Sequence, residues 1–203
     1  MLALDHIAVA CGSLDEGRRH VESALGVSLE AGGQHARFGS HNLLLGLADG
    51  IYLEVIAIDP DAPAPKGARW FALDRFTGGP RVTNWICRTD GMAKTLDRFP
   101  YDMGPVERLR RGDLEWDMAA ANGELPYDQG APAIIDWGKT PHPSSRLAQS
   151  GLRLEKLEIF RPAADRLARD MAPFFDDPRV VFQPGENRMR ATFSGPDGPK
   201  VLL

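Results

Sequence analysis

The sequence has few cysteines, no long apolar run and no signal-like start, and each shortage excludes a class of protein. Only Cys11 and Cys87 occur among the 203 residues, too few for a disulfide framework or a metal site built from cysteines. No apolar stretch approaches the roughly 20 residues that a membrane span needs. The N-terminus also lacks a basic start followed by a hydrophobic signal core. We therefore expect a cytoplasmic protein with no membrane partner.

Long basic runs are absent as well. The net charge is −4, and the longest basic cluster, residues 108–111, is too short to follow a phosphate backbone. Nucleic acid is therefore not an expected partner. The hydrophobic content of 43% and the charged content of 26% are ordinary for a globular protein. The length allows one large domain or two small ones.

Two ionisable residues stand in the middle of short apolar stretches. His6 lies within Leu4–Ala10 and Glu54 within Ile51–Ala57, and both stretches have the length and composition of strands. Burying an unpaired charge in a strand costs several kcal/mol or shifts the pKa of the group. The pair therefore indicates strands that line a polar cavity. Imidazole with carboxylate is also a common first half of a divalent-metal site. His6 taken alone would favour a hydrogen-bonded core histidine, and it is the matching position of Glu54 that favours the cavity.

Residues 1–60 have the order of a βαβββ module. The first strand is residues 4–10, and Ser13 with Glu16 has the spacing of a capping box, which predicts a helix over about residues 14–25. The turn at residues 48–50 joins the last two strands as a hairpin. The further strands are expected near residues 28–30, 35–38, 42–47 and 52–58.

The same order of elements recurs along the chain. Residues 61–80 begin with a proline-rich stretch and are predicted to be a linker. Residues 81–145 form a second module, in which Asp90 is expected to cap a helix over about residues 91–99. Residues 146–203 form a third, degenerate βαβββ-like unit. Because such repeats must pair to close a core, we expect one compact domain.

Several short pieces of sequence occur in an order and spacing typical of one family. They are Leu4-Asp5-His6, Leu25-Gly26-Val27, Gly32-Gly33-Gln34-His35, Gly39-Ser40-His41-Asn42, Tyr52-Leu53-Glu54, Trp70-Phe71-Ala72-Leu73, Trp116, and Ile134–Gly138 followed by His142-Pro143. Together they resemble the glyoxalase-like branch of the vicinal oxygen chelate (glyoxalase/bleomycin resistance/dioxygenase) superfamily. The resemblance implies an α+β fold of paired βαβββ modules, whose strongly curved mixed sheets enclose a cleft.

The resemblance also implies a divalent-metal site, which this sequence matches only in part. Members hold an ion such as Zn, Fe, Mn, Ni or Mg with a histidine of a first strand and a glutamate of a last strand, and His6 and Glu54 match those positions. In the second module, Trp85 stands at the histidine position, and only Asp136 offers a carboxylate near the last strand. We therefore predict that any metal is bound weakly.

Further residues are candidates for contacts with a small-molecule substrate. His35 follows Gly32-Gly33, a pair that permits a tight turn with positive φ, and Asn42 follows at the next matching motif. His142 is held between two prolines. An aromatic wall is predicted from three tryptophans, Trp85, Trp116 and Trp137.

The resemblance implies a small-molecule enzyme of lyase, isomerase or dioxygenase type that acts on a substrate with vicinal oxygens. Glu54 would be a metal ligand or a general base whose pKa burial raises. His6 would be a ligand or a proton shuttle. The alternative is a binding or sequestering protein of the same fold without catalysis, favoured by the missing ligands and the tryptophans. The oligomeric state stays open, with a homodimer as one alternative.

Overall fold

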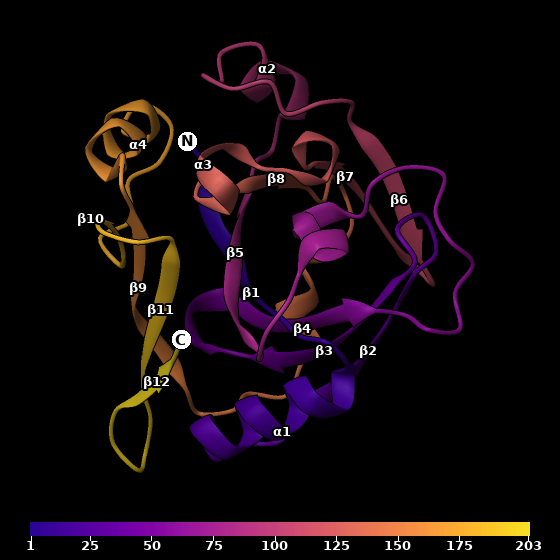
Figure 1. Cartoon of the computed structure of the whole chain (residues 1–203), viewed down its shortest axis with the longest axis vertical. Helices are drawn as coiled ribbons and strands as arrows, with labels where there is room; N and C mark the ends of the chain where they lie inside the picture. The colour runs from indigo at the N-terminus through magenta and orange to yellow at the C-terminus, as the bar shows by residue number, and fades with distance from the viewer.

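The computed structural model describes residues 1–203 and shows three consecutive units of strands and short helices (Figure 1). The first unit contains β1 (Ala3–Ala10), α1 (Leu14–Leu25), β2 (Glu30–His35), β3 (Ser40–Gly46) and β4 (Tyr52–Ile58). The second contains β5 (Arg81–Arg88), α2 (Met92–Leu96), β6 (Glu107–Arg111), β7 (Leu114–Ala119), α3 (Pro126–Gln129) and β8 (Ala133–Asp136). The third contains β9 (Arg153–Arg161), α4 (Ala164–Met171), β10 (Val180–Pro184), β11 (Arg188–Ser194) and β12 (Lys200–Leu202).

The first two units together form one strongly curved, eight-stranded sheet. Its strand order is β2-β3-β4-β1-β5-β8-β7-β6. In each unit the first strand pairs in parallel with the last, β1 with β4 and β5 with β8, and the two units join where β1 runs antiparallel to β5. The predicted pair of βαβββ modules in a curved mixed sheet is confirmed. So is the placement of residues 4–10 and 52–58 side by side.

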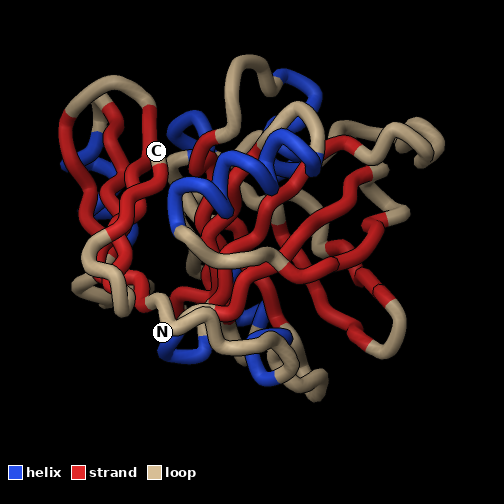
Figure 2. The backbone as a smooth tube through the Cα atoms, turned by 90° about the horizontal axis from the view of Figure 1, so that it is seen from below, coloured by secondary structure: helices blue, strands red, loops and turns tan.

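The third unit forms a separate four-stranded sheet in the order β10-β9-β11-β12. Its chain order is also βαβββ, but β9 pairs in parallel with β10 and antiparallel with β11. The strand order therefore differs from that of the first two modules. The sheet stands beside the large sheet (Figures 1 and 2), where its strand β11 contacts β5, and we call it the C-terminal sheet.

Local sequence signals explain α1 well and α2 poorly. The hydroxyl oxygen of Ser13 accepts a hydrogen bond from the N–H of Glu16, and Gly26 ends α1 with φ of 71°. At α2, the N-cap is Gly91 rather than Asp90, and the hydroxyl of Thr89 accepts from the N–H of Gly91 at 3.3 Å. The helix predicted over residues 91–99 is accordingly shorter. Residues 28–30 and 35–38, predicted as two strands, are replaced by the single strand β2.

A bulge in β1 positions the residues at the centre of the large sheet. The pairing of β1 with β5 shifts register between Leu4 and His6, so that Asp5 is the extra residue. In a regular strand, neighbouring side chains point to opposite faces. The bulge instead lets Asp5 and His6 contact each other. None of the helices combines the length and the apolar composition that a membrane span requires.

The linker predicted at residues 61–80 contains an ordered element. A 3₁₀ segment, η2 (Trp70–Arg75), buries Trp70, Phe71 and Leu73. Two of its residues, Phe71 and Ala72, have positive φ angles of 57° and 53°. Trp70 and Phe71 line a cavity that the large sheet encloses. The segment is therefore more than a connection between modules.

Candidate functional site

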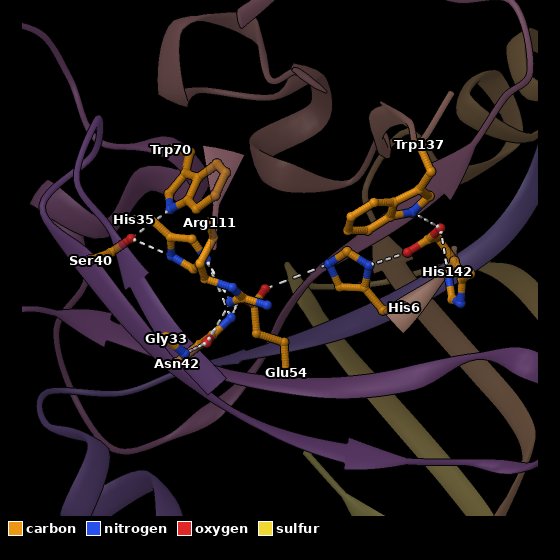
Figure 3. A network of polar contacts seen from close by, with 11 residues as sticks. His6, Gly33, His35, Ser40, Asn42, Glu54, Trp70, Arg111, Trp137 and His142 are labelled. Carbon is orange, nitrogen blue, oxygen red and sulfur yellow. Dashed lines mark hydrogen bonds and ion pairs between the residues drawn. The ribbon is translucent and has the colours of Figure 1, made fainter. Parts of the chain in front are cut away.

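His6 and Glu54 face each other at the centre of the curved sheet, as predicted. Nε2 of His6 lies 3.6 Å from Oε2 of Glu54, and both residues are only 4% exposed (Figure 3). On its other side, Nδ1 of His6 lies 2.6 Å from a carboxylate oxygen of Asp5, which is fully buried. One imidazole therefore lies between two buried carboxylates.

This arrangement sets the charges of the three groups. Burial alone would lower the pKa of His6, but its contacts with Asp5 and Glu54 raise it to about 9. Burial would likewise raise the pKa of Glu54, but the nearby charge of His6 and the hydrogen bond from Asn42 lower it to about 2. The pKa of Asp5 is held well below its usual range by His142 and His6 against the effect of burial. At neutral pH, therefore, His6 is a cation and both carboxylates are ionised. The expectation of a raised pKa for Glu54 is wrong, because its polar contacts outweigh the effect of burial.

A second cluster extends from Glu54 toward the edge of the cavity. The amide nitrogen of Asn42 donates to Glu54 at 2.6 Å, and its amide oxygen accepts from Arg111 at 3.2 Å (Figure 3). Nη1 of Arg111 also lies 3.4 Å from Nε2 of His35. Burial lowers the pKa of His35 to about 4, so that its ring is neutral at physiological pH. Arg111 makes no ion pair with a carboxylate, and it brings a guanidinium from β6 to the first module.

Two glycines of β2, Gly32 and Gly33, leave room for the side chains of Asn42 and Arg111. Neither Gly32 nor Gly33 has a positive φ, so the tight turn that this pair would permit does not form here. A Cβ added at Gly32 would lie 1.9 Å from the amide oxygen of Asn42, and one at Gly33 would lie 2.5 Å from Cδ of Arg111. The N–H of Gly33 also donates to the same amide oxygen at 2.8 Å. The glycines are therefore required for close approach.

The polar groups open into a cavity with aromatic walls, which we call the Glu54 pocket. It holds about 370 Å³ of space not filled by atoms, part of it open to solvent. Trp116 and Trp137 line it from the second module, and their ring centroids are 5.4 Å apart. Tyr52 stacks on His6 at 4.4 Å, and Trp70 and Phe71 of η2 also line the pocket. A ligand with one polar end and an apolar body would match this lining.

Three predicted site residues lie elsewhere. Trp85 packs against Phe175 and Phe182 of the third unit, and its indole N–H donates to the carbonyl of Gly130 at 2.8 Å. It is fully buried away from the Glu54 pocket, so the prediction that it faces a ligand is wrong. His142 does not line the pocket either. Its Nε2 lies 3.0 Å from Asp5, which places it behind His6.

Asp136 is the third of these residues. One carboxylate oxygen accepts from the N–H of Met92 at the start of α2, and the other accepts from the N–H of Gly138. These bonds hold Asp136 at the start of a helix and in a turn, and it does not line the Glu54 pocket, so it is not placed as the additional metal ligand that the sequence allowed.

The remaining donor set does not fit a metal centre held by three or four protein ligands. No group of three or more His, Cys, Asp or Glu side chains is placed to share one ion. The second module contributes five residues to the pocket, and none of them offers a nitrogen or oxygen ligand for a cation beside His6 and Glu54: Arg111, Trp116, Met118, Ile135 and Trp137. The guanidinium of Arg111 adds a positive charge beside the same groups.

Sequence reasoning missed Asp5, Arg111, Trp70 and Phe71 as site residues. Asp5 could not be assigned because a regular strand would turn it away from His6, and only the bulge brings the two together. Arg111 belongs to a short basic cluster, and nothing local shows that it reaches a cavity of the other module. Trp70 and Phe71 belong to the motif Trp70-Phe71-Ala72-Leu73, one of those that carry the family resemblance, and this motif was the signal that could have identified them as site residues.

Comparisons with known proteins agree with this architecture. A family model described as "Glyoxalase-like domain" matches residues 4–175. A search of curated proteins found no match. Among solved structures, a hypothetical protein from Staphylococcus aureus is similar with a TM-score of 0.64 and 16% identity, over 95% of this chain and 81% of that one. At this identity the likeness shows the fold alone.

Methylmalonyl-CoA epimerases are also among the similar structures. The enzyme from Mycobacterium tuberculosis has a TM-score of 0.45 and 20% identity, over 71% of this chain and 97% of that one. A variant from Streptomyces coelicolor has a TM-score of 0.46 and 16% identity, over 70% of this chain and 100% of that one.

Proposed function

The chain belongs to the glyoxalase-like domain family, and from this premise we propose that it is a small-molecule enzyme of isomerase or lyase type. Its substrate carries vicinal oxygens, a carbonyl beside a hydroxyl or carboxylate. The observation that carries the proposal is the buried contact between His6 and Glu54 at the floor of the pocket.

Glu54 and His6 would divide the proton chemistry between them. Glu54 is ionised and would remove a proton from the carbon beside the substrate carbonyl. The electron pair left on that carbon moves to the carbonyl oxygen, which becomes an enolate oxygen. His6 is protonated and would donate its Nε2–H to that oxygen. When the proton-losing carbon bears a hydroxyl, Glu54 would return the proton to the former carbonyl carbon while that hydroxyl loses its proton and becomes the new carbonyl, which completes an isomerisation. When a leaving group stands on the next carbon, the enolate would re-form the carbonyl and a carbon–carbon double bond while that group departs with its electron pair, which completes a lyase reaction.

The distance between His6 and Glu54 would allow the N–H of His6 to leave Glu54 and donate to the substrate oxygen. At 3.6 Å, Nε2 of His6 and Oε2 of Glu54 are farther apart than in a normal hydrogen bond. The N–H of His6 can therefore turn to a substrate oxygen at small cost. Losing that contact removes one of the influences that depress the pKa of Glu54, which makes the carboxylate a better base while substrate is bound.

Arg111 and the aromatic wall would orient the substrate. Because Arg111 makes no ion pair, its guanidinium would bind the second substrate oxygen, most strongly when that oxygen belongs to a carboxylate. The rings of Trp116 and Trp137 would contact the apolar part of the substrate. None of these steps requires a metal ion, in keeping with the donor set of the pocket.

Hydrogen–deuterium exchange tests the proposal. The protein is incubated in D₂O with a panel of hydroxy-ketones, keto-acids and acyl thioesters, and NMR follows exchange at the carbon beside the carbonyl. We expect Glu54→Gln to lose at least 100-fold in exchange rate, as general-base removal commonly does, while ligand binding persists. Glu158→Gln is the matched control, since Glu158 is a buried carboxylate of the C-terminal sheet.

Two results would contradict the proposal. One is exchange by Glu54→Gln at the wild-type rate. The other is loss of exchange on treatment with a chelator and its recovery on addition of a divalent ion, which would assign the chemistry to a metal.

A non-catalytic binding protein is the second candidate. It is favoured by the lining of the Glu54 pocket, in which eight of thirteen residues are hydrophobic. Tight binding of an apolar or aromatic ligand without exchange on any member of the panel would favour this function over the enzyme.

A further inference from the structure

A larger cavity lies between the large sheet and the C-terminal sheet, and the proposed reaction does not use it. It holds about 940 Å³ of space not filled by atoms, part of it open to solvent. Four arginines line it, Arg75 from η2, Arg81 from β5, Arg161 from β9 and the adjacent Arg188 from β11. We call it the arginine cavity.

Most of this positive charge has no carboxylate partner. Arg161 is only 4% exposed, and its guanidinium donates to four main-chain carbonyls, those of Tyr127, Asp128, Phe160 and Arg188. Burying a guanidinium without a counter-ion is costly. The carbonyls satisfy its hydrogen bonds, but they leave its net charge in place.

Arg81 and Arg188 are unpaired as well. The guanidinium of Arg81 donates to the carbonyls of Thr77 and Gly79 and lies 4.3 Å from the ring centre of Phe76. That of Arg188 lies 4.1 Å from the ring centre of Phe160. Neither makes an ion pair. These aromatic contacts hold the planar groups in place while leaving N–H donors for another partner.

The other charged groups do not cancel this excess. Arg75 pairs with Glu124. Asp128 is the one acidic side chain that lines the cavity, and it accepts a hydrogen bond from Asn187. Three guanidinium groups therefore stand against one carboxylate.

Polar atoms in the wall also lack partners. Oγ1 of Thr83 and Nε2 of Gln129 are buried and make no hydrogen bond, and both residues line the cavity. Buried polar groups without partners are rare in folded proteins. Four wall residues, Phe71, Ala72, Asp128 and Gln129, have positive φ, a costly backbone conformation that tends to cluster at functional sites.

We propose that the arginine cavity binds a small molecule that bears a phosphate group. A phosphate dianion offers several oxygens to guanidinium donors and supplies the negative charge that the cavity lacks. The site is separate from the Glu54 pocket, and the proposal does not rest on the proposed reaction. Phe71 lines both cavities, so a ligand in either cavity would contact a side chain that also lines the other.

Calorimetric titration with inorganic phosphate and pyrophosphate tests this site on the full chain. We expect wild-type protein to bind pyrophosphate, with affinity that falls as salt rises. The double variant Arg81→Gln/Arg188→Gln should bind at least tenfold more weakly. The double variant Arg19→Gln/Arg169→Gln is the matched control, because these arginines are exposed on α1 and α4 and their replacement makes the same change in charge outside the cavity. Circular dichroism confirms that each variant is folded.

Three outcomes would overturn the proposal. They are no binding of either anion by wild-type protein, equal weakening by the control Arg19→Gln/Arg169→Gln, and loss of binding in Arg111→Gln but not in Arg81→Gln/Arg188→Gln, which would place the anion in the Glu54 pocket. If Arg81→Gln/Arg188→Gln does not fold, Arg81→Lys and Arg188→Lys replace it. Each keeps the charge but loses the fork of donors, and each should weaken pyrophosphate binding severalfold.

Discussion

The proton on His6 determines the charge of the Glu54 pocket at the scale of single residues. Asp5 and Glu54 are both ionised beside it, and neither would tolerate burial without the cation. Nδ1 bonded to Asp5 fixes the ring and leaves Nε2 facing Glu54. Asp5 thus orients the ring of His6, the candidate acid that follows it in sequence, as the hydrogen-bond partner of a catalytic histidine often does.

Replacing Asp5 should show how strongly the two carboxylates hold that proton. We expect Asp5→Asn to lower the pKa of His6 from about 9 by at least one unit, because one of its two anionic partners is lost while burial remains. NMR titration of the imidazole signals measures this, with the His20 signal on α1 as an internal reference. An unchanged His6 titration would show that Asp5 does not support the charge.

The same groups predict how stability depends on pH. His6 has a folded pKa raised from 6.5 to about 9, so its contribution is complete below pH 6.5 and is lost as pH rises to 9. Glu54, lowered from 4.5 to about 2, contributes above pH 4.5 and loses this as pH falls. His35, lowered to about 4, opposes folding below pH 6.5.

Stability should therefore be greatest near pH 6.5. Each group changes the free energy of unfolding by up to about 1.4 kcal/mol per pH unit between its unfolded and its folded pKa. Urea unfolding from pH 4 to 9.5 measures this curve. In His6→Gln the loss between pH 6.5 and 9 should be smaller, and a curve of unchanged shape in that variant would contradict the assignment.

At the scale of elements, the close approach of β2 to β6 joins the two modules over the pocket. Arg111 at the end of β6 rests against Gly33 of β2. We expect Gly33→Ala to displace Arg111 and to destabilise the fold by about 1–3 kcal/mol, as overpacking does. Gly67→Ala is the control, because nothing lies within 4 Å of a Cβ there. Thermal unfolding compares the two, and equal melting temperatures would show that the contact is unimportant.

Elements also show how far the sequence could predict this molecule. The strands that hold His6 and Glu54 were predictable because both stretches have the length and composition of strands, and an ionisable residue inside each indicated a polar environment. The bulge at Asp5 depends on pairing with β5, about 80 residues away, and leaves no local pattern. The reach of Arg111 into the first module likewise depends on the curvature of the whole sheet, as does the place of Trp85.

At the scale of the whole molecule, the third unit packs against the face of β5 that the sequence assigned to a ligand. Sequence alone groups Trp85 with Trp116 and Trp137 because all three are strand tryptophans of one module. The C-terminal sheet, whose strand order differs from that of the modules, covers Trp85 instead. The arginine cavity lies along the same junction, so the third unit both completes the core and forms a second cavity.

The two kinds of tryptophan should respond differently to truncation. Trp85→Ala removes a fully buried side chain and its bond to Gly130, so it should cost about 3–5 kcal/mol of stability while the ligand affinity of the folded protein stays near wild type. Trp116→Ala should weaken ligand binding, because its ring lines the Glu54 pocket and contributes through contact area. Urea unfolding and titration with a ligand found in the exchange panel measure both effects in each variant. Near-native stability of Trp85→Ala together with weakened binding would contradict this assignment. It would show that Trp85 contacts the ligand and is not buried by the C-terminal sheet.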